Sequence, residues 1–302
     1  MTIPSDQAET IPEKQPIKGF VFMMVSISCF AVMDALVKWF GATYPVHQIM
    51  FFRCTVAFIM ISVLVVRFGG MSLLATNHIG LHVLRSILGL LAMVCAFYGF
   101  TVMPLADASA IFYTAPLLAT AFSVPILGER VGIHRWSCIV IGMLGALVII
   151  RPGGDVLSHG GFFMLIASLL VALTSNIVRK LNRVSAALCI TFYFALSGTL
   201  ASIIACFVLG WASPHGEDLV GLIAIGLLGG AAQFTLTLSL RVGEVGLISP
   251  LKYMAIVIGA IIGYLVWSEV PDTMTFIGMT MIILAGVYSV FRETRSGANK
   301  AV

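Results

Sequence analysis

The sequence predicts an all-α polytopic membrane protein with ten transmembrane helices, arranged as two inverted repeats of five. Three observations lead to this prediction. Of the 302 residues, 60% are hydrophobic and only 10% are charged, whereas soluble domains carry about 25% charged residues. Ten segments are long and apolar enough to cross a bilayer. Lys and Arg are concentrated on alternate connections between these segments, as the positive-inside rule requires.

A spanning helix needs about 20 mostly apolar residues. Short connections rich in Gly, Pro, Asn and Asp separate the segments that meet this condition. None of these connections is long enough for a soluble domain, so the function is expected to lie within the membrane. The predicted spans are 19–39, 47–66, 79–100, 105–127, 134–150, 160–178, 186–210, 219–240, 245–267 and 273–291, with tails over 1–18 and 292–302.

The basic residues predict the orientation. Thirteen Lys and Arg flank the spans on the side of the N-terminus, and only Arg151 flanks them on the other side. Both termini are therefore expected in the cytoplasm. The protein itself is expected in the cell inner membrane. The net charge is +4, but the basic residues are dispersed along the sequence rather than gathered in a patch. This argues against a nucleic-acid partner. The six cysteines lie in apolar segments without metal-site spacing, so no cofactor or metal is expected.

The sequence contains a weak internal repeat. An offset of 140 residues brings Tyr113 onto Tyr253 and Glu129 onto Glu269. One further residue of offset brings Lys38 onto Arg179. The predicted repeats are 19–153 and 154–291. Because each contains an odd number of helices, the second must be inverted in the membrane. Inverted repeats are typical of transporters with a site near the bilayer midplane and two access states.

The stretch from Tyr98 to Gly153 resembles the EamA domain of the drug/metabolite transporter superfamily. The motifs that carry the resemblance are Met103-Pro104-Leu105-Ala106-Asp107-Ala108, Tyr113-Thr114-Ala115-Pro116, Leu127-Gly128-Glu129-Arg130 and Ile149-Ile150-Arg151-Pro152-Gly153. The second copy departs from this pattern, with Ser268 in place of the Gly of the Leu-Gly-Glu motif. The resemblance implies alternating access around a central cavity. It also implies substrates such as amino acids, aromatic metabolites, riboflavin or S-adenosylmethionine.

Two charges lie at matching depths in the first two spans. Asp34 is roughly 8 Å and Arg53 roughly 9 Å from the outer ends of their helices, at 1.5 Å per residue. Asp34 can therefore pair with Arg53 across the helices, or with Lys38 one turn along its own helix. Lys38 can also serve as an anchor at the interface. The cluster is interpreted either as an ion pair that holds the bundle together or as one wall of a polar cavity.

The inner half of the bundle contains Lys252 and Arg85, both roughly 10 Å from the cytoplasmic ends of their helices. The intramembrane charges therefore sum to a positive value, which favours anionic or zwitterionic substrates. Further polar and aromatic residues are predicted to line the cavity, with packing as the alternative role: Tyr98, Tyr113, Asn176, Tyr193, Gln233 and Tyr253. Pro116 and Pro250 are the predicted hinges.

These features predict a secondary active or exchange transporter of a small organic molecule, with proton or counter-solute coupling. Asp34 is the candidate proton carrier, although a neighbouring arginine would favour the ionised carboxylate and oppose that role. A vitamin or cofactor importer is the alternative within transporters. A membrane scaffold or lipid-modifying protein is the alternative of another class. Enzyme motifs are absent from the sequence, and the protein is expected to be a monomer or a homodimer.

Overall fold

The computed structural model of the chain describes residues 15–128, 132–151, 155–242 and 250–298, which are helical almost throughout. The described residues do not include 1–14 of the tail predicted over 1–18, Glu129 and Arg130, the turn after Arg151, or the start of the ninth span. Helix was expected from residue 19 to residue 291, but the first helix begins at Pro16 and the last described helix continues to Ala298. The elements are α1 (Pro16–Gly41), α2 (Val46–Phe68), η1 (Gly70–Leu74), α3 (Ile79–Val102), α4 (Leu105–Phe112), α5 (Ala115–Leu127), α6 (Ile133–Ile150), α7 (Asp155–Leu181), α8 (Ala187–Leu209), α9 (Asp218–Val242), η2 (Pro250–Tyr253), α11 (Met254–Trp267) and α12 (Thr273–Ala298).

The described residues include eight helical segments that are long and apolar enough to cross a membrane. Two shorter apolar segments, Leu251–Trp267 and Thr273–Ser289, follow them. The prediction of an all-α polytopic membrane protein is confirmed. The predicted boundaries also agree closely with the structure; for example, the third span was expected over 79–100 and α3 runs from Ile79 to Val102.

The fourth predicted helix, 105–127, is interrupted, and here the sequence-based prediction was too simple. It consists of α4 and α5, which are separated at Tyr113 and Thr114. Pro116 lies in the first turn of α5. The backbone N–H groups of a first turn make no hydrogen bond within the helix, so a proline there does not disrupt it. Tyr253, the repeat-related residue, lies at the junction of η2 and α11. Both tyrosines therefore occupy a discontinuity between two helical segments.

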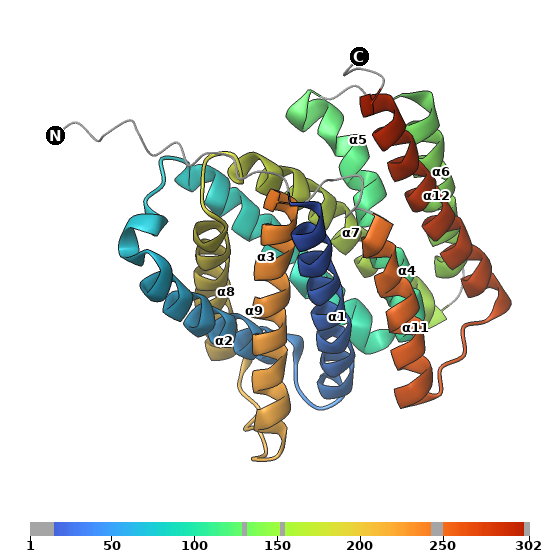
Figure 1. The fold of residues 1–302 in the computed structure, drawn as a ribbon. Helices are drawn as coiled ribbons and strands as arrows, with labels where there is room; N and C mark the ends of the chain where they lie inside the picture. Colours follow the sequence, from blue (N-terminus) through green and yellow to red (C-terminus); the bar gives the residue numbers. More distant parts are fainter. Residues whose placement is uncertain (1–14, 129–131, 152–154, 243–249, 299–302) are drawn as a thin grey trace.

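Helices from the two halves of the chain pack against each other throughout the bundle (Figure 1). The closest pairs are α1 with α9, α3 with α7, α2 with α8 and α6 with α12. Shorter contacts join α4 to α11. Each pair takes one helix from before and one from after the middle of the sequence. The two halves are therefore interleaved, and a space at the centre is lined by both.

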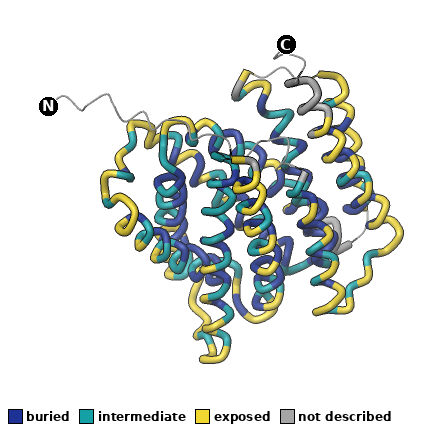
Figure 2. Tube along the Cα trace, viewed as in Figure 1, coloured by how far each residue is buried: buried dark blue, intermediate teal, exposed yellow. Residues whose placement is uncertain are grey.

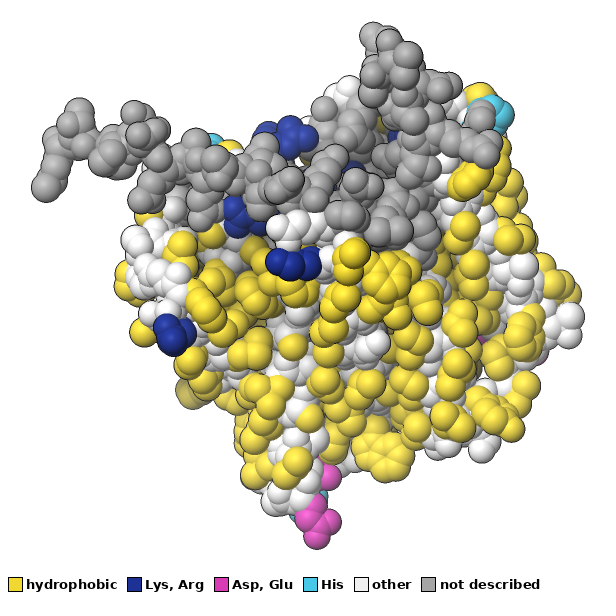
Figure 3. Space-filling model, viewed as in Figure 1, with side chains coloured by type: hydrophobic (Ala, Val, Ile, Leu, Met, Phe, Trp, Pro, Cys, Tyr) yellow, Lys and Arg dark blue, Asp and Glu magenta, His cyan; other side chains and the backbone are white. Residues whose placement is uncertain are grey.

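Helix α1 begins and α12 ends on the same side of the bundle, which we call the N-terminal side; the opposite one is the far side (Figure 1). Buried residues face the inside of the bundle and exposed residues cover its periphery (Figure 2). On the face seen in Figure 3, hydrophobic side chains cover the middle, with Lys and Arg toward one end and Asp and Glu at the other. Such an apolar periphery suits contact with lipid.

Helices α6 and α12 approach each other closely at one edge of the bundle. A Cβ atom added at Gly278 would lie 2.6 Å from the carbonyl oxygen of Gly145, and one added at Gly145 would lie 2.8 Å from the carbonyl oxygen of Gly278. Small residues allow such backbone contact between membrane helices. This contact fixes the last helix of the chain against the last helix of the first half.

Candidate functional site

A cavity of about 220 Å³, counted over the positions that the centre of a water molecule can take, lies at the centre of the bundle. Residues from both halves of the chain line it. Its lining includes Met23, Arg179, Leu240 and Ser289, which lie close to the ends of their helices on the N-terminal side. The cavity therefore extends from the middle of the bundle toward the N-terminal side.

Among the described residues, five charged side chains line this cavity, and they come from five different elements. Asp34 is on α1, Arg53 on α2, Arg85 on α3, Arg179 on α7 and Lys252 on η2. One acid against four bases gives the lining an excess of positive charge. Such a lining attracts anions and anionic groups, and it does so more strongly in a low-dielectric surrounding than in water.

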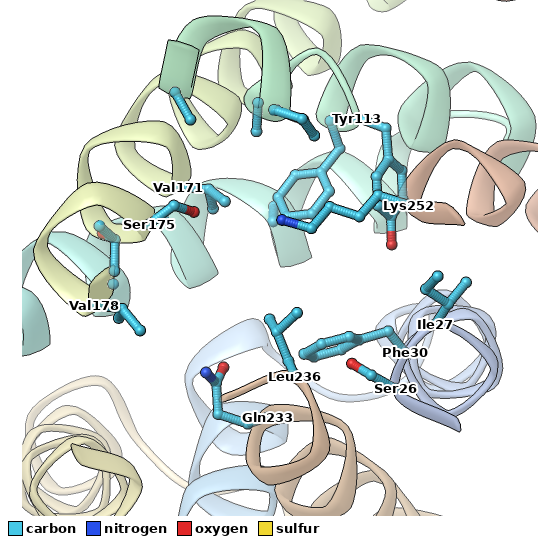
Figure 4. A pocket seen from close by; sticks show the side chains of 18 of the residues that line it. Ser26, Ile27, Phe30, Tyr113, Val171, Ser175, Val178, Gln233, Leu236 and Lys252 are labelled. Atoms are coloured by element: carbon cyan, nitrogen blue, oxygen red, sulfur yellow. The ribbon is translucent and has the colours of Figure 1, made fainter. Parts of the chain in front are cut away.

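Polar and aromatic side chains from facing walls point into the same space. In Figure 4, Lys252 and Tyr113 lie on one side of the cavity, and Gln233 and Ser26 lie on the other. Tyr253 and Pro116 also belong to the lining. The cavity thus has hydrogen-bonding groups on opposite walls, which can hold a solute in one orientation.

The sequence allowed an ion pair between Asp34 and Arg53, and the structure does not contain it. Both side chains face the cavity, but no hydrogen bond or ion pair connects Asp34 to another described residue. The guanidinium carbon of Arg53 lies 5.4 Å from the centre of the Phe194 ring instead. Asp34 and Arg53 are therefore both available to a third group within the cavity.

Lys38 does not line the cavity. Its ammonium forms an ion pair with Glu269 and donates a hydrogen bond of 3.0 Å to the carbonyl oxygen of Met103. It also lies 5.0 Å from the centre of the Trp267 ring. The expected pairing with Asp34 is replaced because the end of α11 brings an acid next to Lys38. The second oxygen of Glu269 accepts a hydrogen bond of 2.9 Å from the backbone N–H of Leu105.

Packed side chains connect the helices on the far side of the bundle. We call Lys38, Trp39, Tyr44, Trp267 and Glu269 the far-side closure. The rings of Trp39 and Trp267 are 6.2 Å apart. The hydroxyl of Tyr44 donates a hydrogen bond of 2.6 Å to Asp218, and this carboxylate raises the pKa of Tyr44. These contacts join the end of α1 and the loop that follows it to the end of α11 and the start of α9 on the far side of the bundle.

A more exposed ion pair joins α6 to the start of α12 on the same side. The guanidinium of Arg151 donates to Asp272. Arg151 lowers the pKa of Asp272 to about 2 through this hydrogen bond. Because both side chains are largely in contact with solvent, the pair is expected to contribute little to the stability of the bundle.

Three other residues predicted for the cavity lie outside it. Tyr98 is 38% exposed on the periphery, with its ring 4.8 Å from that of Phe163. Asn176 is buried and donates to the carbonyl oxygen of Ala119, and Tyr193 donates to the carbonyl oxygen of Leu74. These three side chains point to neighbouring helices or outward because the rotation of a helix about its axis is set by packing. Pro250 begins η2, and its side chain is not described.

Most of the lining residues were not predicted from the sequence, and Phe194 and Arg179 matter most among them. Phe194 lies in an apolar run, and nothing in its local pattern distinguishes it from a packing residue. Arg179 was assigned to the cytoplasmic flank, although the internal repeat aligned it with Lys38. That alignment was the only sign that Arg179 occupies a special position.

The apolar periphery, the interleaved halves and the charged central cavity define the class of protein. They are typical of a multi-pass membrane transporter that binds a solute near the middle of the bilayer. The family can also be stated. The sequence profile of the EamA-like transporter family matches residues 17–151 and again residues 158–292, so the chain belongs to this family.

Characterised relatives cover almost the whole chain. The S-adenosylmethionine uptake transporter of Rickettsia prowazekii is 26% identical over 95% of this chain and 97% of its own length. The pseudopaline exporter CntI of Pseudomonas aeruginosa is 31% identical over 88% and 94%. The riboflavin transporter of Rhizobium johnstonii is 23% identical over 94% and 95%. A solved crystal structure matches 93% of this chain and 99% of its own with a TM-score of 0.70 and 17% identity, which shows the same fold.

The chain is therefore a small-molecule transporter of the EamA-like family, embedded in the membrane by several spans. In a bacterium, that membrane is the inner membrane. The relatives' names cover both uptake and export and three different solutes. Family membership alone thus leaves the solute and the direction to be argued from the cavity.

Proposed function

We propose that the protein is a secondary active or exchange transporter of a small anionic or zwitterionic metabolite, which moves by alternating access through the central cavity. The observation that carries this proposal is that the described part of the lining has one acid and four bases, in a cavity that both halves of the chain enclose. Burying uncompensated like charges is costly, so a purely structural bundle has no reason to keep them. An anionic group of the solute offsets that cost.

We also propose the topology in which this function operates. The chain contains two inverted five-helix repeats, 19–153 and 154–291, with both termini in the cytoplasm. The two separate matches to the family profile and the interleaved packing support this division. In this topology the N-terminal side is cytoplasmic. The structure then represents an inward-facing state, with the far-side closure sealing the outer entrance.

Alternating access requires the far-side closure to open. The closure consists of one ion pair, one pair of tryptophan rings and a few hydrogen bonds, all between helix ends. Such contacts can be exchanged for water, whereas a continuous apolar interface cannot be opened as readily. Pro116 and the breaks at Tyr113 and Tyr253 are the proposed positions at which the helices bend during this exchange.

Reconstituted protein tests the proposal. Liposomes that contain the full-length protein are loaded with one unlabelled solute, and uptake of the same solute in labelled form is measured. The solutes are amino acids, S-adenosylmethionine and riboflavin. The proposal predicts saturable uptake of at least one solute that carries a carboxylate. The absence of flux for every solute, with the protein still folded, would favour a non-transporting scaffold.

The relatives support a second, narrower candidate. One relative is named an S-adenosylmethionine uptake transporter and another a riboflavin transporter. The lining also contains four aromatic side chains, Phe30, Phe97, Phe112 and Tyr113. Such rings can pack against a planar ring system in the solute. Uptake of S-adenosylmethionine or riboflavin in preference to free amino acids would support this candidate.

Coupling to protons is tested in the same liposomes. Asp34 is the only acid that lines the cavity among the described residues. A proton-coupled mechanism predicts that an imposed pH gradient drives uptake in the wild type and that Asp34→Asn abolishes this effect. An exchange mechanism predicts that only a gradient of counter-solute drives uptake.

A further inference from the structure

Two buried arginines in the cavity have N–H groups without an acceptor. Arg53 is 5% exposed and Arg85 is 3% exposed. The Nε atom of Arg53 and the Nε and Nη1 atoms of Arg85 have no hydrogen-bond partner among the described residues. A guanidinium keeps its charge under all ordinary conditions and has five N–H donors. Leaving such donors unpaired in a buried place is costly unless a ligand supplies the acceptors.

Both guanidinium groups lie at the same aromatic ring. The central carbon of Arg85 is 3.5 Å from the centre of the Phe194 ring, and that of Arg53 is 5.4 Å from it. The two carbons are therefore at most about 8.9 Å apart, the sum of these distances. Both arginines also belong to the lining of the cavity, so a carboxylate bound in the cavity can accept hydrogen bonds from their guanidinium groups. The contact with the ring holds each guanidinium in its orientation.

Two glycines make room for this arrangement. A Cβ atom at Gly89 would lie 3.3 Å from Nη1 of Arg85 and 2.9 Å from the Phe194 ring. A Cβ atom at Gly229 would lie 3.2 Å from Nε of Arg53. Any larger residue at either position would press on an arginine side chain. The positions of the two guanidinium groups thus depend on glycine in two different helices, α3 and α9.

We propose that Arg53, Arg85 and Phe194 form a carboxylate-binding subsite, and that Asp34 binds a cationic group at the other end of the same solute. The substrate class is then a zwitterion that carries a carboxylate and an ammonium or sulfonium group. This inference rests on the proposed function, because the subsite lies in the transport cavity. It goes further by assigning each end of the solute to named residues.

The first test compares solutes that differ in one group. Thermal unfolding of the purified full-length protein is measured with the protein amino acids, S-adenosylmethionine, 5′-methylthioadenosine and inorganic phosphate, because a ligand of the folded state raises the melting temperature. At least one carboxylate zwitterion is expected to raise it. Its carboxyl amide is expected to bind at least about 30-fold more weakly, since the arginine donors are left unpaired. Stabilisation by methylthioadenosine or phosphate alone would overturn the inference.

The second test uses variants of the arginines. Arg53→Met and Arg85→Met are expected to abolish the ligand-induced shift. The melting temperature of ligand-free Arg85→Met should be equal to or higher than that of the wild type, because an unpaired buried charge is removed. Gly89→Ala retains both arginines and is expected to weaken ligand binding by displacing Arg85. Arg67→Gln, an exposed arginine on the same helix as Arg53, is the matched control and should behave as the wild type.

The outcomes separate this inference from the proposed function. A solute that is transported equally well as its carboxyl amide, or whose transport is unaffected in both Arg→Met variants, overturns the subsite and leaves the transporter proposal intact. Absence of transport and of thermal stabilisation for every zwitterion overturns both. A loss of melting temperature in ligand-free Arg85→Met would show that the arginine is structural, and that result also overturns the subsite.

Discussion

The far-side closure predicts that removing one carboxylate changes which side of the protein is open. Glu269 accepts hydrogen bonds from Lys38 and from the backbone of Leu105, and both are lost in Glu269→Ala. Hydrogen bonds to charged groups contribute about 1.5–3 kcal/mol each. The side chains of Lys38 and Glu269 are 11% and 23% exposed, so solvent screening reduces this contribution. Lys38 also keeps its bond to Met103.

With solvent screening and the remaining bond to Met103 taken into account, the two lost hydrogen bonds lower the stability of the closed state by about 2 kcal/mol. This corresponds to a shift of roughly 30-fold in the ratio of closed to open molecules. Opening can be followed with spin labels at Thr43 and Val270, two exposed positions in loops on either side of the closure. The labels are placed in a background without the native cysteines. Double electron–electron resonance should show a larger population at long distance in Glu269→Ala than in the parent protein.

The exposed ion pair between Arg151 and Asp272 provides the matched control. Asp272→Asn removes a carboxylate from the same side of the bundle, but its partner is largely solvated. Only a few-fold change in the distance populations is expected there. Equal populations in Glu269→Ala and the parent protein, or an equally large effect of Asp272→Asn, would refute the role given to the Lys38–Glu269 pair.

Three further predictions follow from the same structure. Lys252→Met should reduce the initial rate of anionic-solute uptake in liposomes by about tenfold or more, because it removes a positive charge from the cavity; an unchanged rate would contradict this. Gly278→Ala should lower the melting temperature by forcing α12 away from Gly145. Gly80→Ala, at a position with open space around it, should not lower the melting temperature. Asp272 has a pKa of about 2, below its value of about 3.9 in an unfolded chain. The stability that its carboxylate contributes is therefore present above about pH 4 and is lost as the pH falls toward 2. Arg151→Met should remove this pH dependence from unfolding curves.

The sequence was sufficient to predict most of the spans, although not the break between α4 and α5, and it was insufficient to predict which helices pack together. Span boundaries depend on hydrophobic length, a local property, and α3 agrees with its prediction almost to the residue. The pairing of Lys38 with Glu269 joins residues far apart in the sequence. The local spacing of Asp34 and Lys38 favoured a different pair. Which acid a lysine contacts depends on the approach of two helices, and no spacing within one helix encodes that approach.

The candidate site shows the same division. Asp34, Arg53, Arg85 and Lys252 were predicted because a charge in an apolar span needs a reason, and all four line the cavity. Tyr98, Asn176 and Tyr193 were predicted from residue type alone, and each has a partner elsewhere or faces outward. Charge is informative in a membrane helix because its cost is high. Charge was not sufficient by itself, since Lys38 lies outside the cavity. Aromatic and amide side chains are tolerated at many positions: Tyr113, Gln233 and Tyr253 line the cavity, whereas the other three do not.

The contact between Gly145 and Gly278 has a consequence for how the protein is made. Helix α6 leaves the ribosome long before α12, which is the last helix described. Until α12 is inserted, the glycine face of α6 has no helix to cover it and is exposed to lipid. The final packing of the first half must therefore wait until α12 has been synthesised and inserted. A chain that stops before α12 would keep most of its spans but would leave the glycine face of α6 without its partner helix.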